Sequence, residues 1–207
     1  VLTAARSAIE EAIAAIRPPD DAASDAACAL QLRLTKPAGA LGRLEELHIW
    51  AAGVLRDVVP APRRKLIVVA AADHGIAVEG VSAYPQDVTW QMVLNFLAGG
   101  AAINALAAHA GAEVRVVDAG VARDIDHPSL HVAKLRPGTA NMAIGPVMSR
   151  GDAEAIVARG IEFARDECAR GADVIALGDM GIGNTTAAAA ITSVLAGAPP
   201  RVTVGRG

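Results

Sequence analysis

A glycine-rich turn late in the chain carries the strongest chemical signal in the sequence. The residues Gly178-Asp179-Met180-Gly181-Ile182-Gly183 follow an apolar run and lead into helix formers that begin with Asn184-Thr185-Thr186. Glycines let backbone N–H groups approach a ligand, and a helix N-terminus presents unpaired donors with partial positive charge, so this arrangement suits a phosphate. The spacing is neither that of a Walker A loop nor the G-x-G-x-x-G of dinucleotide-binding folds. The alternative is an ordinary strand-to-helix turn with Asn184 or Thr185 as its N-cap.

Two other polar loops follow apolar runs in the same way. Asp73-His74-Gly75 comes after Leu66–Ala70, and Asp118-Ala119-Gly120 comes after Glu113–Val117. Ligands of open parallel sheets bind outside the carboxyl ends of the strands, so we expect these loops and the glycine-rich turn to converge at one edge. His74 has two equally supported roles there, a structural hydrogen bond at the strand end or a contact with substrate. Asp179 would repel a phosphate and therefore suits a ribose hydroxyl or another donor.

The segment from Glu79 to Gln91 is unusual in a chain with 2% aromatic residues, because it contains the only tyrosine and one of two tryptophans. An apolar rim with a few directional polar groups suits a flat heteroaromatic ligand. The alternative, equally supported by composition, is a loop before a helix in which the rings of Tyr84 and Trp90 fill the core. Four potential metal ligands lie close together between Asp124 and His131, but Pro128 interrupts them, and a solvated loop is the better interpretation.

The elements that must position these residues change in type near residue 60. Helix formers dominate before it, in 4–16, 21–32 and 41–55. After it, β-branched apolar runs at 66–70, 113–117, 131–135, 173–177 and 201–204 predict strands. They alternate with predicted helices at 87–110, 149–169 and 184–195. Strands that alternate with helices predict an α/β fold with a parallel sheet covered by helices, so we expect a helical segment at 1–60 and an α/β domain at 61–207.

Composition excludes several classes of protein. The 207 residues include 19 basic and 22 acidic side chains, a net charge of −3, which argues against nucleic-acid binding through bulk electrostatics. The longest apolar run, Leu66–Ala72, is too short to span a membrane, and the N-terminus does not resemble a signal peptide. Cys28 and Cys168 are isolated in sequence, and we expect a reduced pair of small core residues. These features predict a cytoplasmic globular protein without nucleic-acid or membrane partners.

Six motifs, taken in order, resemble those of the nicotinate-nucleotide–dimethylbenzimidazole phosphoribosyltransferases of cobalamin assembly. They are Lys36–Glu45, Ala72–Gly75, Val81–Gln91, Val117–Val121, Gly138–Met142 and Gly178–Thr186. The resemblance implies a doubly wound, mostly parallel sheet, a smaller helical domain built from terminal segments, and a homodimer. It also implies transfer of phosphoribose from nicotinate mononucleotide to 5,6-dimethylbenzimidazole, giving α-ribazole 5′-phosphate and nicotinate, without a metal or other cofactor.

The same resemblance assigns roles to residues of this chain. Ser82, Tyr84 and Gln91 would line the benzimidazole pocket; Gly181, Gly183, Asn184 and Thr185 would hold the phosphate; and Asp179 would be the carboxylate beside the ribose and the transition state. Family members are longer and carry their catalytic carboxylate in the C-terminal part, so we expect this chain to be truncated on that side and to lack the general base. The alternatives are an α/β domain that binds nucleotide without turnover, and a different nucleotide-processing α/β enzyme.

Overall fold

The computed structural model describes residues 2–205 and divides them into two compact units. The helical unit comprises residues 11–63. The α/β unit comprises the described residues up to Glu10 and those from Arg64 onward. The first helix, α1 (Leu2–Ala14), therefore contributes its first turns to the α/β unit.

The helical unit is built around two helices, α2 (Asp21–Arg33) and α3 (Arg43–Leu55). The side chain of Asp20 caps α2 by accepting a hydrogen bond from Ala23 N at 2.9 Å. The ring of His48 joins the two helices, because its Nδ1 lies 2.9 Å from Nε2 of Gln31 and its Nε2 lies 3.0 Å from the Val58 carbonyl oxygen. The three helices predicted before residue 60 are thus confirmed.

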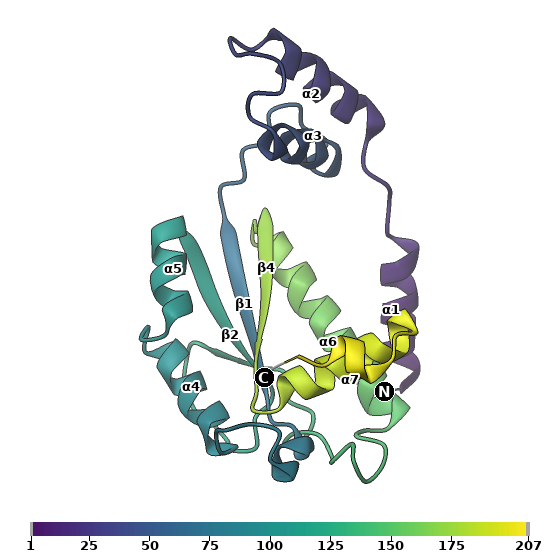
Figure 1. Cartoon of the computed structure of the whole chain (residues 1–207), viewed down its shortest axis with the longest axis vertical. Helices are drawn as coiled ribbons and strands as arrows, with labels where there is room; N and C mark the ends of the chain where they lie inside the picture. The colour runs from purple at the N-terminus through teal and green to yellow at the C-terminus, as the bar shows by residue number, and fades with distance from the viewer. Residues whose placement is uncertain (1, 206–207) are drawn as a thin grey trace. The chain divides into compact units, whose positions relative to one another are not determined.

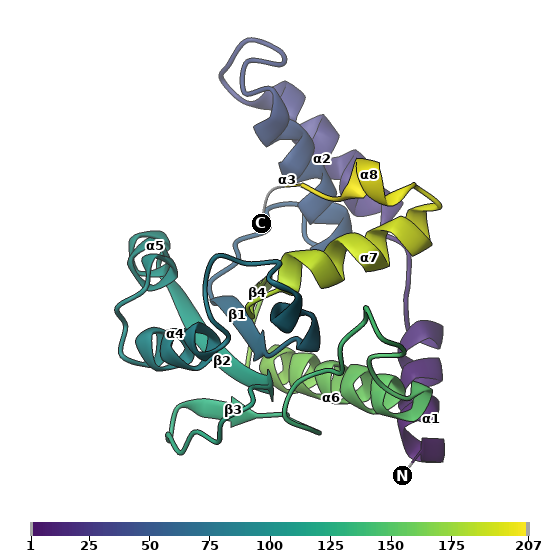
Figure 2. The same ribbon diagram turned by 60° about the horizontal axis from the view of Figure 1, so that its bottom comes forward.

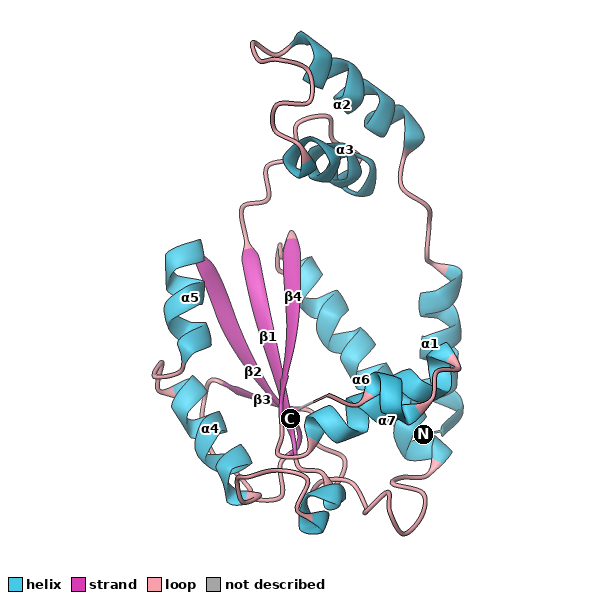
Figure 3. Cartoon of the chain, viewed as in Figure 1, coloured by secondary structure: helices cyan, strands magenta, loops and turns pink. Residues whose placement is uncertain are grey.

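The α/β unit is built on a parallel sheet in the order β3-β2-β1-β4 (Figure 3). Its strands are β1 (Lys65–Ala72), β2 (Ala112–Gly120), β3 (Leu130–Val132) and β4 (Val174–Met180). Ala72 at the end of β1 pairs with Gly120 of β2, and Ala71 pairs with Met180 of β4. The carboxyl ends of these three strands therefore lie at one edge, as the α/β prediction requires.

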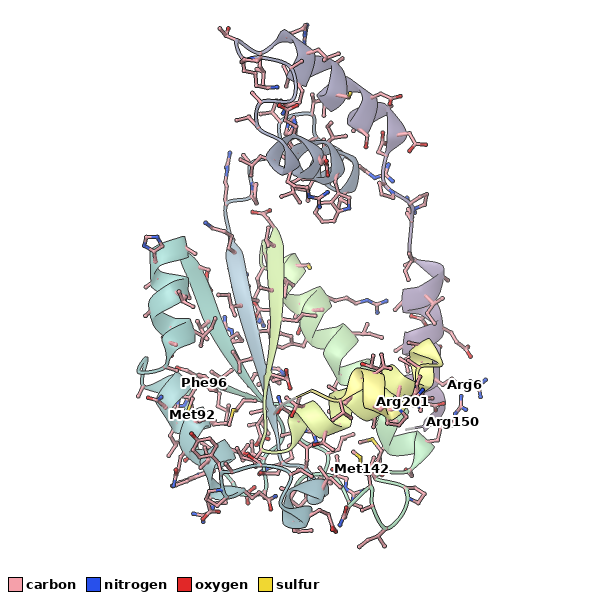
Figure 4. All side chains as sticks on the ribbon, viewed as in Figure 1. Arg6, Met92, Phe96, Met142, Arg150 and Arg201 are labelled. Carbon is pink, nitrogen blue, oxygen red and sulfur yellow. The ribbon has the colours of Figure 1, made fainter. Side chains whose placement is uncertain are left out.

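Helices cover both faces of this sheet (Figure 1). α4 (Asp87–Leu97) and α5 (Ala102–Ala110) lie on one face, and α6 (Arg150–Ala169) lies on the other. Side chains alternate along β2, so Val116 packs with Val93 of α4 and Val117 packs in the cluster that includes Phe163 of α6. Phe96 of α4 joins the first cluster, and Figure 4 shows it beside Met92 on that helix.

Beyond the sheet edge, three short or terminal helices complete the unit, as the turned view in Figure 2 shows for the last two. A single 3₁₀ turn, η1 (Gly75–Glu79), follows β1. α7 (Asn184–Ala196) follows β4, and α8 (Pro200–Thr203) follows α7. The helix predicted at 149–169 is confirmed, and the side chain of Ser149 caps it by accepting from Asp152 N at 3.0 Å.

The single helix predicted over 87–110 is wrong. By length and composition alone, Asp87–Ala110 would suffice to cross a membrane. The structure instead divides it, because Gly99 adopts φ +78° and the side chain of Asn104 starts α5 by accepting from Ala101 N at 3.1 Å. The same side chain donates to the Phe96 carbonyl oxygen at 3.1 Å, so it joins the end of α4 to the start of α5.

Two smaller predictions are also wrong. Residues 201–204, predicted as the start of a strand, form most of α8, because Pro200 occupies its first turn and Val204 N bonds to the Pro200 carbonyl oxygen. Cys28 and Cys168, expected in the core, are both exposed thiols on the outer faces of α2 and α6. The helix formers around each cysteine correctly predicted a helix, but they did not indicate whether the cysteine lies on its buried or its exposed face.

Candidate functional site

The three polar loops meet at the carboxyl edge of the sheet, as predicted. Asp73 N donates to the Gly120 carbonyl oxygen at 3.0 Å, which joins the loop after β1 to the end of β2. A Cβ placed on Gly181, after β4, would overlap the carbonyl oxygen of Ala72 at the end of β1. Only glycine allows so close an approach, so the loops form one continuous surface.

Two buried carboxylates accept hydrogen bonds from the loops at this edge. Asp118 Oδ1 accepts from Gly120 N at 3.0 Å and from Val121 N at 2.8 Å, and its Oδ2 lies 3.2 Å from Lys134 Nζ. Asp73 Oδ2 accepts from Ala122 N at 2.6 Å, while its Oδ1 is buried without a hydrogen-bond partner. Three of the four carboxylate oxygens thus have a partner in place of water, and the Asp73–Ala122 bond joins the loop after β1 to the loop after β2.

The glycine-rich turn enters α7 without a side-chain cap. Gly183, at φ +88°, is the N-cap residue, so the alternative interpretation that Asn184 or Thr185 caps the helix is wrong. Asn184 instead donates its side-chain N–H to Asp179 Oδ2 at 2.6 Å, across the turn. No acidic residue lies in the first turn of α7, so the N–H groups there keep their attraction for an anion.

Tyr84 and Trp90, which are close in sequence, lie in different environments in the structure. Trp90 packs against the core on the α4 side of the sheet, and the guanidinium carbon of Arg123 lies 4.9 Å from its ring centre. Tyr84 is 66% exposed, and its backbone N–H donates to Oγ of Ser82 at 3.2 Å. The core-filling interpretation therefore holds for Trp90, whereas Tyr84 remains available to a ligand.

A groove of about 600 Å³ joins this segment to the glycine-rich turn, since Val81 and Thr185 both line it. It continues along α7 to Thr203 of α8. Gln91 lies on an exposed face of α4, and among residues 2–205 the structure shows no hydrogen bond between it and Ser82 or Tyr84. Of the predicted site residues, Asp179, Gly181, Gly183, Asn184 and Thr185 are thus brought together in one turn.

The loop that contains Gly138–Met142 is fastened to the loop after β1. Gly75 N donates to Thr139 Oγ1 at 3.2 Å, and Asn141 Nδ2 donates to Glu79 Oε1 at 2.6 Å. A Cβ on Gly75 would lie 2.5 Å from the backbone carbon of Ala140. The sequence of this segment by itself indicates an ordinary turn. Only the tertiary contacts show that it packs against the loop after β1 at the sheet edge.

A further residue of the site, Thr89, lies within the Val81–Gln91 motif, but nothing in its type or spacing indicates its role. It lies within α4, its side chain is fully buried, and its Oγ1 accepts from Ile182 N in the glycine-rich turn at 3.0 Å. In the sequence, a threonine at this position of a predicted helix cannot be distinguished from any other residue on the buried face of that helix. Within the described residues, no group of three or more His, Cys, Asp or Glu side chains is arranged to hold a metal ion.

His74 lies directly against the glycine-rich turn. Its Cδ2 and Nε2 atoms are 3.0 Å from the position that a Cβ on Gly181 would take. Burial lowers the pKa of His74 below its usual 6.5, although the nearby charges of Asp73 and Asp179 oppose that shift. The imidazole is therefore neutral at pH 7, able to donate from one ring nitrogen and accept at the other.

We expect Asp179→Asn to lower the pKa of His74 further. The substitution removes a negative charge that favours the imidazolium, while burial remains unchanged. The measurement is the NMR titration of the His74 ring protons in both proteins. Asp25→Asn, at an exposed position in the helical unit, is the matched control and should leave the titration in place. A His74 pKa that rises in Asp179→Asn would contradict this electrostatic account.

Comparison with known proteins identifies the family. A family model described as phosphoribosyltransferase matches residues 16–207. The nicotinate-nucleotide–dimethylbenzimidazole phosphoribosyltransferase of Roseiflexus sp. is 52% identical over 97% of this chain and 57% of its own length. The enzyme of the same name from Thermus thermophilus is 56% identical over 84% of this chain and 52% of its own length. The chain thus spans little more than half the length of these relatives.

A solved structure agrees with these matches. The crystal structure of CobT from Thermus thermophilus superposes with a TM-score of 0.86 at 54% sequence identity, covering 89% of this chain and 56% of that one. The chain therefore belongs to the family of nicotinate-nucleotide–dimethylbenzimidazole phosphoribosyltransferases.

Proposed function

We propose that this chain supplies the substrate-binding edge of an enzyme that transfers phosphoribose from nicotinate mononucleotide to 5,6-dimethylbenzimidazole in cobalamin biosynthesis. The observation that carries the proposal is the groove in which the uncapped start of α7 lies beside the segment that precedes α4. Thr185 in the first turn of α7 lines one side of the groove, where a helix N-terminus suits a phosphate, and Val81 lines the other side. Tyr84, three residues beyond Val81, is exposed and suits a flat base. The names of the family members supply the identity of the two substrates.

The family resemblance supplies the proposed role of each residue. Gly181, Gly183, Asn184 and Thr185 hold the 5′-phosphate at the start of α7. Asp179, which Asn184 orients through the 2.6 Å hydrogen bond, faces the ribose. Ser82, Tyr84 and Gln91 contact the benzimidazole. The exposed positions of Tyr84, Gln91 and Asp179 are consistent with side chains that become covered when substrate binds.

The reaction exchanges one glycosidic bond for another. A ring nitrogen of dimethylbenzimidazole attacks C1′ of the ribose, and the bond from C1′ to the nicotinate nitrogen breaks, with its electron pair leaving on nicotinate. The N–H proton of the benzimidazole passes to a general base, which we assign to a part of the enzyme other than the residues named above. Positive charge develops on the ribose during the exchange, so a carboxylate at the position of Asp179 stabilises the transition state electrostatically.

We further propose that the enzyme works as a cytoplasmic homodimer, with the helical unit as part of its smaller domain. The helical unit supports a role in assembly, because it leaves large apolar side chains such as Leu32, Leu44 and Trp50 exposed. Neither a metal nor another cofactor enters the reaction as written.

Calorimetry and a single-turnover assay test the proposal. We expect the chain to bind nicotinate mononucleotide and dimethylbenzimidazole, and a longer family member in parallel to release α-ribazole 5′-phosphate. Binding without product from the 207-residue chain would support the assignment of the general base to another segment, and product from this chain would contradict that assignment. Binding of a nucleoside triphosphate with no binding of either substrate would instead favour a different nucleotide-processing enzyme.

A further inference from the structure

A buried hydrogen bond connects α4 to the glycine-rich turn. Thr89 has an exposed fraction of 0%, and its Oγ1 accepts from the backbone N–H of Ile182 at 3.0 Å across 93 positions of sequence. Ile182 is itself buried. Without Thr89, this N–H would be a buried donor with no partner, a state that folded proteins avoid.

The position of Ile182 makes this bond important for the turn. It lies between Gly181 and Gly183, two residues whose backbones have more conformational freedom than any other type. A side chain at either glycine has no room, because a Cβ on Gly181 would meet Ala72 and His74 and a Cβ on Gly183 would meet Ile76. Within the turn, Asn184 N donates to the Gly181 carbonyl oxygen at 2.9 Å. The Thr89 bond adds an anchor from outside the turn, because it joins the Gly181–Ile182 peptide to α4.

The other end of the bond lies on the helix that follows the proposed base-binding segment. α4 begins directly after Ser82–Gln86 and carries Gln91 two positions beyond Thr89. Val93, one turn further along, is fully buried in the core, and Asp87 at the start of the helix pairs with Arg123 at 2.7 Å. α4 therefore packs on the sheet through Val93, and the turn is bonded to it through Thr89.

We propose that Thr89 is a positioning residue that sets the phosphate-binding turn in register with the base-binding helix. The inference rests on the proposed function for the identity of the two ligands. Thr89 touches neither substrate. Its hydroxyl holds the Ile182 N–H, and thereby sets the place of the first turn of α7 at the phosphate while the base site on α4 stays in place.

The test compares Thr89→Val, which keeps the shape but removes the acceptor, with Thr89→Ser, which keeps the hydroxyl. Thr35→Val is the matched control, because it makes the same chemical change at an exposed position in the helical unit. Two quantities are measured on the whole chain: amide hydrogen exchange at Ile182, and the Kd of nicotinate mononucleotide and of dimethylbenzimidazole by calorimetry. Thermal unfolding confirms that each variant is folded.

In Thr89→Val we expect exchange at Ile182 to accelerate about tenfold or more, and nicotinate mononucleotide to bind about tenfold more weakly, as for the loss of one buried hydrogen bond. Dimethylbenzimidazole should bind within about twofold of the unaltered chain, and Thr89→Ser should restore both quantities. Unchanged exchange at Ile182, equal losses for both ligands, or no rescue by serine would overturn the proposal.

The exchange measurement and the binding measurement together distinguish a failure of this inference from a failure of the proposed function. If the unaltered chain binds neither ligand, the proposed function fails, and the exchange measurement still decides whether Thr89 holds the turn. If exchange accelerates as expected and nucleotide affinity does not change, the bond exists but does not position the phosphate site, which contradicts the proposal.

Discussion

Gly181→Ala is expected to abolish measurable nucleotide binding, with a loss of about a hundredfold or more in affinity. A methyl group at this position would overlap the carbonyl oxygen of Ala72 and press on the ring of His74 at 3.0 Å. The first neighbour is backbone of the central strand and cannot yield, so the turn must move away from the sheet. That movement displaces the N–H groups at the start of α7, and the crowding should lower the free energy of unfolding by about 3 kcal/mol.

Gly178→Ala is the matched control for this prediction. Gly178 lies in β4, and its added methyl would meet only the Val68 carbonyl oxygen at an ordinary 3.6 Å. Calorimetry with nicotinate mononucleotide and thermal unfolding should distinguish the two variants clearly. Near-normal nucleotide affinity in a folded Gly181→Ala protein would show that the turn does not bind the phosphate.

Glu167→Gln is expected to lower the free energy of unfolding by about 3 kcal/mol, as for other buried ion pairs that lose one partner. Glu167 lies on α6 at the sheet edge opposite the site, and its side chain is 1% exposed. Its Oε2 lies 2.9 Å from Arg64, and its Oε1 lies 2.9 Å from Arg170 and 3.6 Å from Arg115. The amide would leave the partly buried Arg64 and Arg115, and the more exposed Arg170, without their shared counter-charge.

Glu113→Gln provides the contrast, because Glu113 also pairs with Arg64 at 2.9 Å but is 54% exposed. A solvent-screened pair contributes less than about 1 kcal/mol, so this variant should unfold within that margin of the unaltered chain in urea. Equal losses in the two variants would contradict the assignment of the larger effect to burial.

The pH dependence of stability gives a second check on Glu167. Burial alone raises the pKa of its carboxyl, but hydrogen bonds from Arg64 and Arg170 and the charge of Arg115 outweigh burial, so the folded pKa lies below the usual 4.5. The ionised form therefore stabilises the fold fully above pH 4.5, and this contribution is lost as the pH falls through the folded pKa. The difference in stability between the unaltered chain and Glu167→Gln should shrink on acidification, and a difference that grows would contradict this account.

The local chemistry of the sequence was sufficient for the order of the strands β1 to β4 along the chain and for the edge where the site lies. Buried strands require β-branched apolar runs, and glycines and polar residues must follow where each strand turns, so Val68, His74 and Gly181 identify their places without any distant partner. The six motifs extended this to the family. The same local patterns misplaced the end of the chain, because Arg201–Val204 is β-branched yet follows the proline that starts α8.

Tertiary structure decided which of these residues act together. Trp90 and Tyr84 are close in sequence, but the former fills the core beneath Arg123 and the latter is exposed. The division between α4 and α5 depends on Asn104 reaching back to Phe96, as well as on Gly99.

The sequence by itself therefore determined the α/β fold, the family and the edge at which the loops converge, since periodicity and turn residues report on each position's own backbone. The tertiary structure alone decided that Thr89 bonds to Ile182, that Gly181 packs on Ala72, and that Glu167 is shared by three arginines. These contacts join residues that are far apart in sequence. No local pattern encodes them, because they exist only when the sheet brings separate strand ends and helices together.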